Sequence, residues 1–132
     1  QFRIGVGMLR LEQLDEVTRL GEGLEQSGRL NPEPMARTVS AIAGMTDEAK
    51  AQRVAAIAAV GTAGLRIAPN GPDLVRDVEA RCALHVEVIS GEDEARLAYL
   101  AAVAGLGLTG PGSRVVFDTG GGSSQFSFGD GD

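Results

Sequence analysis

The chain has 132 residues, with 12 Lys and Arg against 18 Asp and Glu, so its formal net charge at pH 7 is −6. This length suits one domain with a single hydrophobic core, and the acidic balance argues against a nucleic-acid-binding domain, which would normally be basic. No run of 18 apolar residues is present, so we predict no membrane span. The single cysteine, Cys82, excludes an internal disulfide and favours a cytoplasmic protein.

The first predicted elements are a hairpin and a long helix. Residues Phe2–Leu14 alternate between apolar and small or polar residues, which predicts two strands that turn near Gly5–Gly7. Asn31 directly before Pro32 is typical of a helix start. Apolar residues then recur at helical spacing, so we expect this helix to run to about Gln52.

Strands and helices alternate through the middle of the chain. The short apolar run Val54–Val60 predicts a buried strand, and Leu84–Ile89 predicts another. Between them, residues 71–83 carry apolar side chains on one helical face. Ser90 begins a pattern that resembles a capping box, and we expect a third helix from there to about Val103.

The last predicted elements are two strands joined by a glycine loop. The strands are Arg114–Asp118 and Gln125–Phe128, and the loop is Thr119–Ser124. Alternating strands and helices in the middle, with hairpins at both ends, predict an α/β domain with a mixed sheet.

The glycine loop carries the strongest chemical signal. Three consecutive glycines let backbone N–H groups approach an anion, and Ser123 and Ser124 add hydroxyl donors. Asp118, at the end of the strand, is placed to hold a metal ion or to orient a water. The loop leads into a strand and has no Gly-Lys-Ser/Thr, so it is neither a Rossmann fingerprint nor a Walker A loop. The structural alternative is a plain glycine-rich turn.

Two further segments hold candidate residues. Glu92, Asp93 and Glu94 crowd a predicted helix start, where they would act as ordinary first-turn acids or, in one case, activate a water as general base. The segment Gly61–Arg66 places an arginine just past a strand end, which suits bidentate phosphate contact. The alternative for this arginine is a surface position on a loop.

Four motifs, taken in order, resemble those of the exopolyphosphatase / guanosine-pentaphosphate phosphohydrolase family, which belongs to the superfamily of sugar kinases, actin and heat-shock chaperone ATPases. The motifs are Leu20–Leu24 followed by Gly28–Leu30, then Gly61–Arg66, Val88–Arg96 and Asp118–Gln125. The resemblance implies an actin-like ATPase (ribonuclease H-like) domain with a mixed sheet flanked by helices. It also implies that residues 1–132 form a single N-terminal lobe, with the first phosphate loop upstream and the second lobe downstream.

The resemblance also implies the roles of the candidate residues. Members of the family remove terminal phosphate from polyphosphate or the 5′ γ-phosphate from guanosine pentaphosphate. Glu94 matches the proposed general base, and Asp118 matches a ligand of a divalent cation, usually Mg²⁺; Gln125 stands at a metal position where the family has Glu. The positions that match phosphate-binding residues are Thr62, Arg66, Gly120, Gly121, Gly122, Ser123 and Ser124.

Two departures from the family pattern keep other functions open. A neutral amide at Gln125 is a weaker ligand for a hard cation than a carboxylate, and Ala63 replaces a serine. The leading prediction is a phosphohydrolase, inactive as this fragment and a homodimer at full length. The alternatives are a regulatory protein that binds polyphosphate or guanosine penta- or tetraphosphate without hydrolysis, and an ATP-dependent kinase of the same superfamily. The Ser90–Arg96 stretch favours the phosphatase branch.

Overall fold

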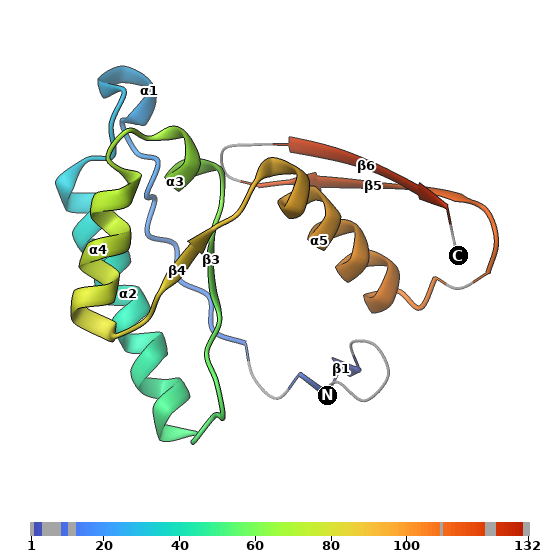
Figure 1. The fold of residues 1–132 in the computed structure, drawn as a ribbon, viewed down its shortest axis with the longest axis horizontal. Helices are drawn as coiled ribbons and strands as arrows, with labels where there is room; N and C mark the ends of the chain where they lie inside the picture. Colours follow the sequence, from blue (N-terminus) through green and yellow to red (C-terminus); the bar gives the residue numbers. More distant parts are fainter. Residues whose placement is uncertain (1, 4–8, 11–12, 109, 121–123, 131–132) are drawn as a thin grey trace. The chain divides into compact units, whose positions relative to one another are not determined.

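The computed structural model describes residues 2–3, 9–10, 13–108, 110–120 and 124–130 (Figure 1). The chain divides into two compact units, Leu14–Ile89 and Gln1–Gln13 with Ser90–Asp132. None of the helices in the described part of the chain combines the length and apolar character needed to cross a membrane.

The described strands form three pairs, of which two are antiparallel and one is parallel. The pairs are β1 (Phe2–Arg3) antiparallel to β2 (Leu9–Arg10), β3 (Ala59–Gly61) parallel to β4 (Val86–Val88), and β5 (Ser113–Thr119) antiparallel to β6 (Ser124–Asp130). The predicted N-terminal hairpin is confirmed by the β1–β2 pair, and its predicted turn at residues 5–7 lies outside the described residues. The predicted C-terminal strand–loop–strand is confirmed by β5 and β6.

The three long helices follow the prediction from the sequence. The helices are α1 (Leu24–Ser27), α2 (Pro32–Ala51), α3 (Ala63–Ile67), α4 (Gly71–Cys82) and α5 (Gly91–Gly105). The side chain of Asn31, the residue before α2, makes no capping bond and instead donates to the Glu22 carbonyl at 2.9 Å. The short helices α1 and α3 were not predicted, because four or five residues cannot display a helical period.

The predicted strand Val54–Val60 is wrong over most of its length, since only Ala59–Gly61 forms a strand. The partner strand explains this. Helix α4 ends at Cys82 and Ala83 adopts a left-handed conformation with φ of 51°, so β4 offers only Val86–Val88 for pairing. A strand needs a partner along its length, and the residues before Ala59 have none in this ladder.

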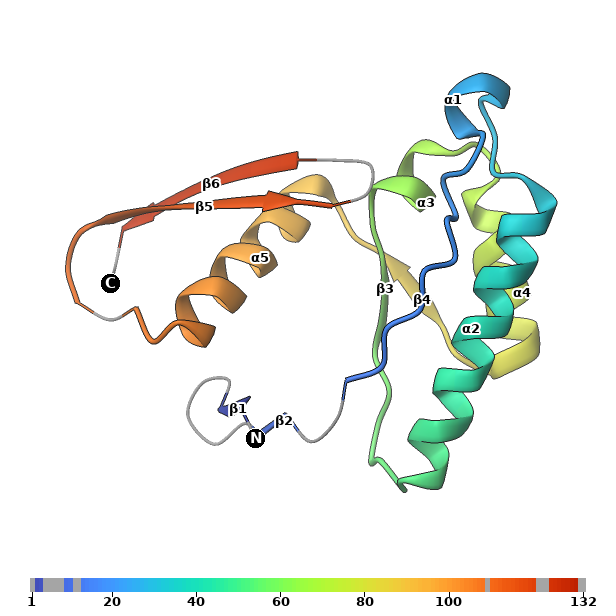
Figure 2. The same cartoon turned by 180° about the vertical axis from the view of Figure 1, so that it is seen from behind.

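The core of the Leu14–Ile89 unit lies between α2, α4 and the β3–β4 ladder. Helices α2 and α4 lie side by side in both views (Figures 1 and 2). The buried core residues are Leu30, Val39, Ala68, Leu74, Val78, Cys82, Leu84 and Val86. The predicted apolar face of α4 is therefore confirmed, because three of its residues belong to this cluster.

Asn70, just before α4, is a buried polar residue whose amide is fully engaged. Its Oδ1 accepts from the Leu30 N–H at 2.9 Å and its Nδ2 donates to the Leu30 carbonyl at 3.0 Å. A buried amide without such partners would be destabilising. The pair joins the turn between α3 and α4 to the segment that leads into α2.

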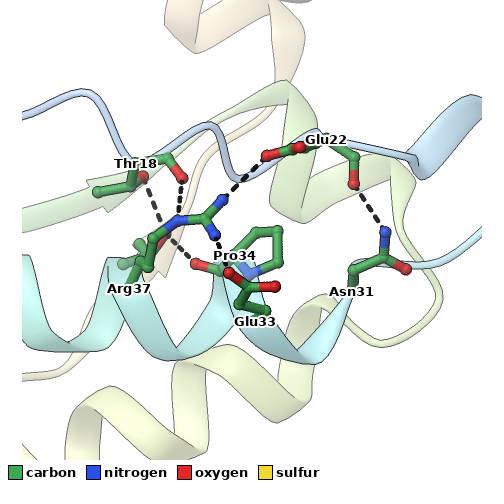
Figure 3. Close-up of polar contacts among 7 residues, drawn as sticks. Thr18, Glu22, Asn31, Glu33, Pro34 and Arg37 are labelled. Carbon is green, nitrogen blue, oxygen red and sulfur yellow. Dashed lines mark hydrogen bonds and ion pairs between the residues drawn. The ribbon is translucent and has the colours of Figure 1, made fainter.

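Arg37 on α2 holds the glycine-rich motif that precedes α1 (Figure 3). Its guanidinium forms ion pairs with Glu22 and Glu33, each at 2.9 Å, and its Nε donates to the Thr18 carbonyl at 3.3 Å. The planar guanidinium can serve several acceptors at once. The motif is thereby fixed along α2, and its Leu20 packs against the core.

Gly71 allows α3 and α4 to approach closely, and this predicts a stability change. A Cβ at this buried position would overlap the backbone carbonyl of Leu65. We expect Gly71→Ala to lower the free energy of unfolding by about 1–3 kcal/mol, the usual cost of overpacking. Urea unfolding measures it. Gly44→Ala in α2 is the control, since nothing lies within 4 Å of the added Cβ and the helix should gain up to about 1 kcal/mol. Equal shifts for the two variants would contradict the steric explanation.

Candidate functional site

The β5–β6 hairpin positions the predicted glycine loop. Asp118 pairs with Gln125 across the ladder, and Thr119 pairs with Ser124, whose hydroxyl lies 3.0 Å from the Thr119 hydroxyl. Residues 120–123 join the two strands beyond this pair. Gly120 and Ser124 are exposed, and the predicted phosphate-binding Gly121, Gly122 and Ser123 lie outside the described residues.

Alternation along both strands decides which side chains face α5. The half-buried residues are Arg114, Val116 and Asp118 on β5, and Gln125, Ser127 and Gly129 on β6. Side chains alternate between the two faces of a ladder, so these six share one face. Both views show α5 lying along the hairpin, and the contacts of Ser127 and Gly129 identify the half-buried face as the one that meets α5 (Figures 1 and 2). Asp118 and Gln125 thus lie together on the α5 side.

Two contacts anchor α5 to β6. The Ser127 hydroxyl donates to the Ala95 carbonyl at 3.1 Å. One turn further along α5, the ring of Tyr99 packs over Gly129, where a Cβ would come within 2.5 Å of the ring. Because Glu94 immediately precedes Ala95, the Ser127 bond fixes the helical turn that carries the predicted general base.

The three acidic residues at the start of α5 have different surroundings. The Ser90 hydroxyl accepts from the Asp93 N–H at 3.0 Å and donates to the Asp93 carboxylate at 2.7 Å, which confirms the predicted cap. Glu92 and Asp93 are exposed, whereas Glu94 is half-buried. Ordinary capping and solvation therefore account for the first two, and Glu94 is the acid withdrawn from solvent.

Thr62 and Arg66 lie in the Leu14–Ile89 unit, where strand β3 ends. Arg66 lies on the short helix α3 and not on a loop, which was the alternative for this residue. Its Nη1 donates to the Ile89 carbonyl at 2.8 Å, and the Ile89 N–H donates to the Gly61 carbonyl at 3.1 Å. Arg66 is exposed and held at the carboxyl ends of two parallel strands, the edge where open α/β sheets bind ligands.

The structure thus brings Asp118 and Gln125 together and fixes Glu94 on the adjacent helix, while Thr62 and Arg66 belong to the other unit. No three His, Cys, Asp or Glu side chains form a metal-binding group among the residues that the structure describes. Mg²⁺ is often held by one or two carboxylates together with substrate phosphates and waters. A single carboxylate at Asp118 suits a cation that a substrate phosphate also binds, and does not suit a cation bound by protein ligands alone.

Sequence reasoning missed Ser127 and Tyr99 as the contacts that hold α5. The alternation of the last strand already places Ser127 on the face of Gln125, so this signal was present in the sequence. Its partner, the Ala95 carbonyl, is 32 residues away and belongs to a helix with no matching pattern.

The model of the Ppx/GppA phosphatase family matches residues 4–132. The chain belongs to the Ppx/GppA phosphatase family. The family match covers all four motifs, including the Gln125 position.

Similar proteins extend well beyond the length of this chain. A curated Haemophilus influenzae protein named "Putative exopolyphosphatase" is 32% identical over 122 residues, which is 91% of this chain and 36% of that protein. The structure of an Aquifex aeolicus Ppx/GppA phosphatase is 34% identical with a TM-score of 0.74, covering 88% of this chain and 38% of its own. The structure of a Cytophaga hutchinsonii exopolyphosphatase is 26% identical with a TM-score of 0.80, and the match covers 86% of this chain and 36% of that protein. The predicted α/β, actin-like fold is confirmed, and the chain spans little more than a third of these relatives.

The Ser90 cap predicts a local effect at the start of α5. Replacing Ser90 with Ala removes the acceptor for the Asp93 N–H and should cost about 1 kcal/mol. We expect faster hydrogen exchange at the amides of Asp93 and Glu94, with little change in β5 and β6. Ser90→Thr retains a hydroxyl and serves as the control. Unchanged exchange in Ser90→Ala would show that the cap does not hold this turn.

Proposed function

We propose that the whole protein is a phosphohydrolase that releases terminal phosphate from inorganic polyphosphate, from guanosine pentaphosphate or from both. The observation that carries the proposal is the β5–β6 register, which sets Asp118 opposite Gln125 at the base of the glycine loop. The anchored turn of α5 with its half-buried Glu94 supports it. Membership of the Ppx/GppA phosphatase family supports the class of reaction.

The chemistry is in-line attack of water on a terminal phosphoryl group. Glu94 would orient the water and take its proton as the new P–O bond forms and the bond to the bridging oxygen breaks. A divalent cation, Mg²⁺, held by Asp118 and in part by Gln125, would neutralise negative charge on the phosphates. The protein's own task at this end of the hairpin is to fix the carboxylates relative to the loop, through the cross-strand pair and the Ser127 bond.

The phosphate oxygens would be held by backbone N–H groups and by hydroxyl and guanidinium donors. In this proposal the loop residues are Gly120, Gly121, Gly122, Ser123 and Ser124. Thr62 and Arg66 contribute from the ends of the parallel strands. A guanidinium carries five N–H donors, so the bond from Arg66 to the Ile89 carbonyl orients the plane that meets the phosphate.

We further propose that residues 1–132 act as the N-terminal lobe of a two-lobed, homodimeric cytoplasmic enzyme. The relatives are more than twice as long as this chain, which supports a larger functional protein. On this proposal the fragment alone is inactive, because part of the cleft lies elsewhere in the protein.

One observation favours a second candidate function, binding without hydrolysis. Gln125 lies directly opposite Asp118, so the departure from the family's Glu falls beside the proposed cation. An amide oxygen binds a hard cation less strongly than a carboxylate does. A protein that binds phosphorylated ligands but turns them over slowly would carry such a change.

The role of Glu94 predicts a large loss of activity. In the full-length protein, Glu94→Gln should lower phosphate release by at least about 100-fold, the scale of general-base catalysis. Circular dichroism should remain unchanged. Glu92→Gln removes the same charge from an exposed position two residues earlier on the same helix and should retain activity. Near-normal turnover in Glu94→Gln, or an equal loss in Glu92→Gln, would refute the assignment.

The proposed position of Gln125 beside the cation predicts that Gln125→Glu raises the affinity for metal. Gln125→Glu adds a carboxylate opposite Asp118, so half-maximal phosphate release should need less Mg²⁺. A metal titration of phosphate release measures this. Gln52→Glu adds the same charge in the other unit and should leave the titration unchanged. An unchanged midpoint in Gln125→Glu would argue against a cation at this pair.

A further inference from the structure

A groove in the Leu14–Ile89 unit contains Arg66 together with a second arginine that the proposed chemistry does not use. Arg66 and Arg76 both line it, and the groove has a volume of about 550 Å³. Binding sites for small molecules commonly measure about 300–1,000 Å³. The groove is therefore large enough for a ligand that extends beyond the phosphate contacted by Arg66.

The two arginines are held in place by different partners. Arg66 donates to the Ile89 carbonyl at the end of β4. Arg76, on the exposed side of α4, forms an ion pair with Asp73 one turn earlier. Each guanidinium is thus oriented by a neighbour in its own unit. Two cations in one groove stand out in a chain whose net charge is −6.

The rest of the described lining of the groove is apolar. It includes Pro69 and Pro72, which are both exposed, and Val88 at the end of β4, which is 41% exposed. A polyphosphate chain carries charge on every unit, so it gains nothing from such a surface and loses hydration beside it. A nucleoside has a flat, largely apolar base that gains from burial there. Arginine guanidinium planes also stack on bases.

We propose that this groove binds the nucleoside part of a nucleoside polyphosphate substrate. The phosphates pass Arg66, and the base lies between Arg76 and the apolar surface of Pro69, Pro72 and Val88. The inference rests on the proposed function, because it takes Arg66 as a phosphate contact. It adds a preference, since the groove improves binding of a nucleotide and not of inorganic polyphosphate.

The test compares two substrates in the full-length protein. Arg76→Ala should lower kcat/KM for guanosine pentaphosphate by about tenfold, the scale of losing one stacking contact, mainly through a higher KM. Hydrolysis of inorganic polyphosphate should be unchanged. Arg81→Ala removes the same charge from the last turn of α4, outside the described lining of the groove, and is the matched control. An equal loss for both substrates, or no difference from Arg81→Ala, would overturn the proposal.

A second variant tests the apolar surface without removing charge. Val88→Thr keeps a β-branched side chain in β4 but replaces one methyl group with a hydroxyl, so it should selectively weaken nucleotide binding and leave the strand intact. Unchanged kinetics with guanosine pentaphosphate in this variant would count against the apolar contact.

Binding measurements separate this proposal from the proposed function. Calorimetry with guanosine 5′-diphosphate and with pyrophosphate needs no turnover. The groove predicts that Arg76→Ala weakens only the guanosine ligand. Arg76-dependent nucleotide binding without hydrolysis would retain the groove and refute the phosphohydrolase. Hydrolysis of both substrates with no effect of Arg76→Ala would refute the groove alone.

Discussion

The pairing register of β5 and β6 is the constraint on which the candidate site depends. Because side chains alternate along a strand, a slip of one residue would move Asp118 or Gln125 to the opposite face of the hairpin. Contacts on both faces oppose such a slip. Phe117 and Phe126 stack with ring centroids 4.6 Å apart on one face, and Ser127 bonds to α5 on the other. The same contacts that fix the strands therefore fix the acidic residue and its amide partner.

The two units use different structural devices to hold polar groups. In the hairpin unit, side chains meet across an antiparallel ladder, and the helix that carries Glu94 is bonded to it through a backbone carbonyl. In the Leu14–Ile89 unit, a short helix after a parallel strand carries Arg66, whose guanidinium is bound by the residue that follows the neighbouring strand. In each unit a few contacts orient a charged side chain, Glu94 in one and Arg66 in the other, and that side chain remains near the surface.

Much of this arrangement was predictable from local patterns, and the remainder depended on long-range contacts. Pro32 and Ser90 marked helix starts, and a glycine run between two alternating segments indicated the strand–loop–strand that carries Asp118 and Gln125. The length of β3 was not predictable, because it is limited by where α4 ends and β4 begins. The bond between Arg66 and Ile89 spans 23 residues and leaves no mark in either local sequence. The α3 helix escaped prediction because it is a single turn.

Gln125 bears most directly on whether the protein has the catalytic activity of its family, because it faces the one carboxylate proposed to hold the cation. The most direct measurement is phosphate release by the full-length protein from polyphosphate and guanosine pentaphosphate, with and without Mg²⁺, alongside calorimetric binding of guanosine tetraphosphate. The phosphohydrolase account predicts release that depends on Mg²⁺ from at least one substrate. Binding of guanosine tetraphosphate with no release from either substrate would contradict it.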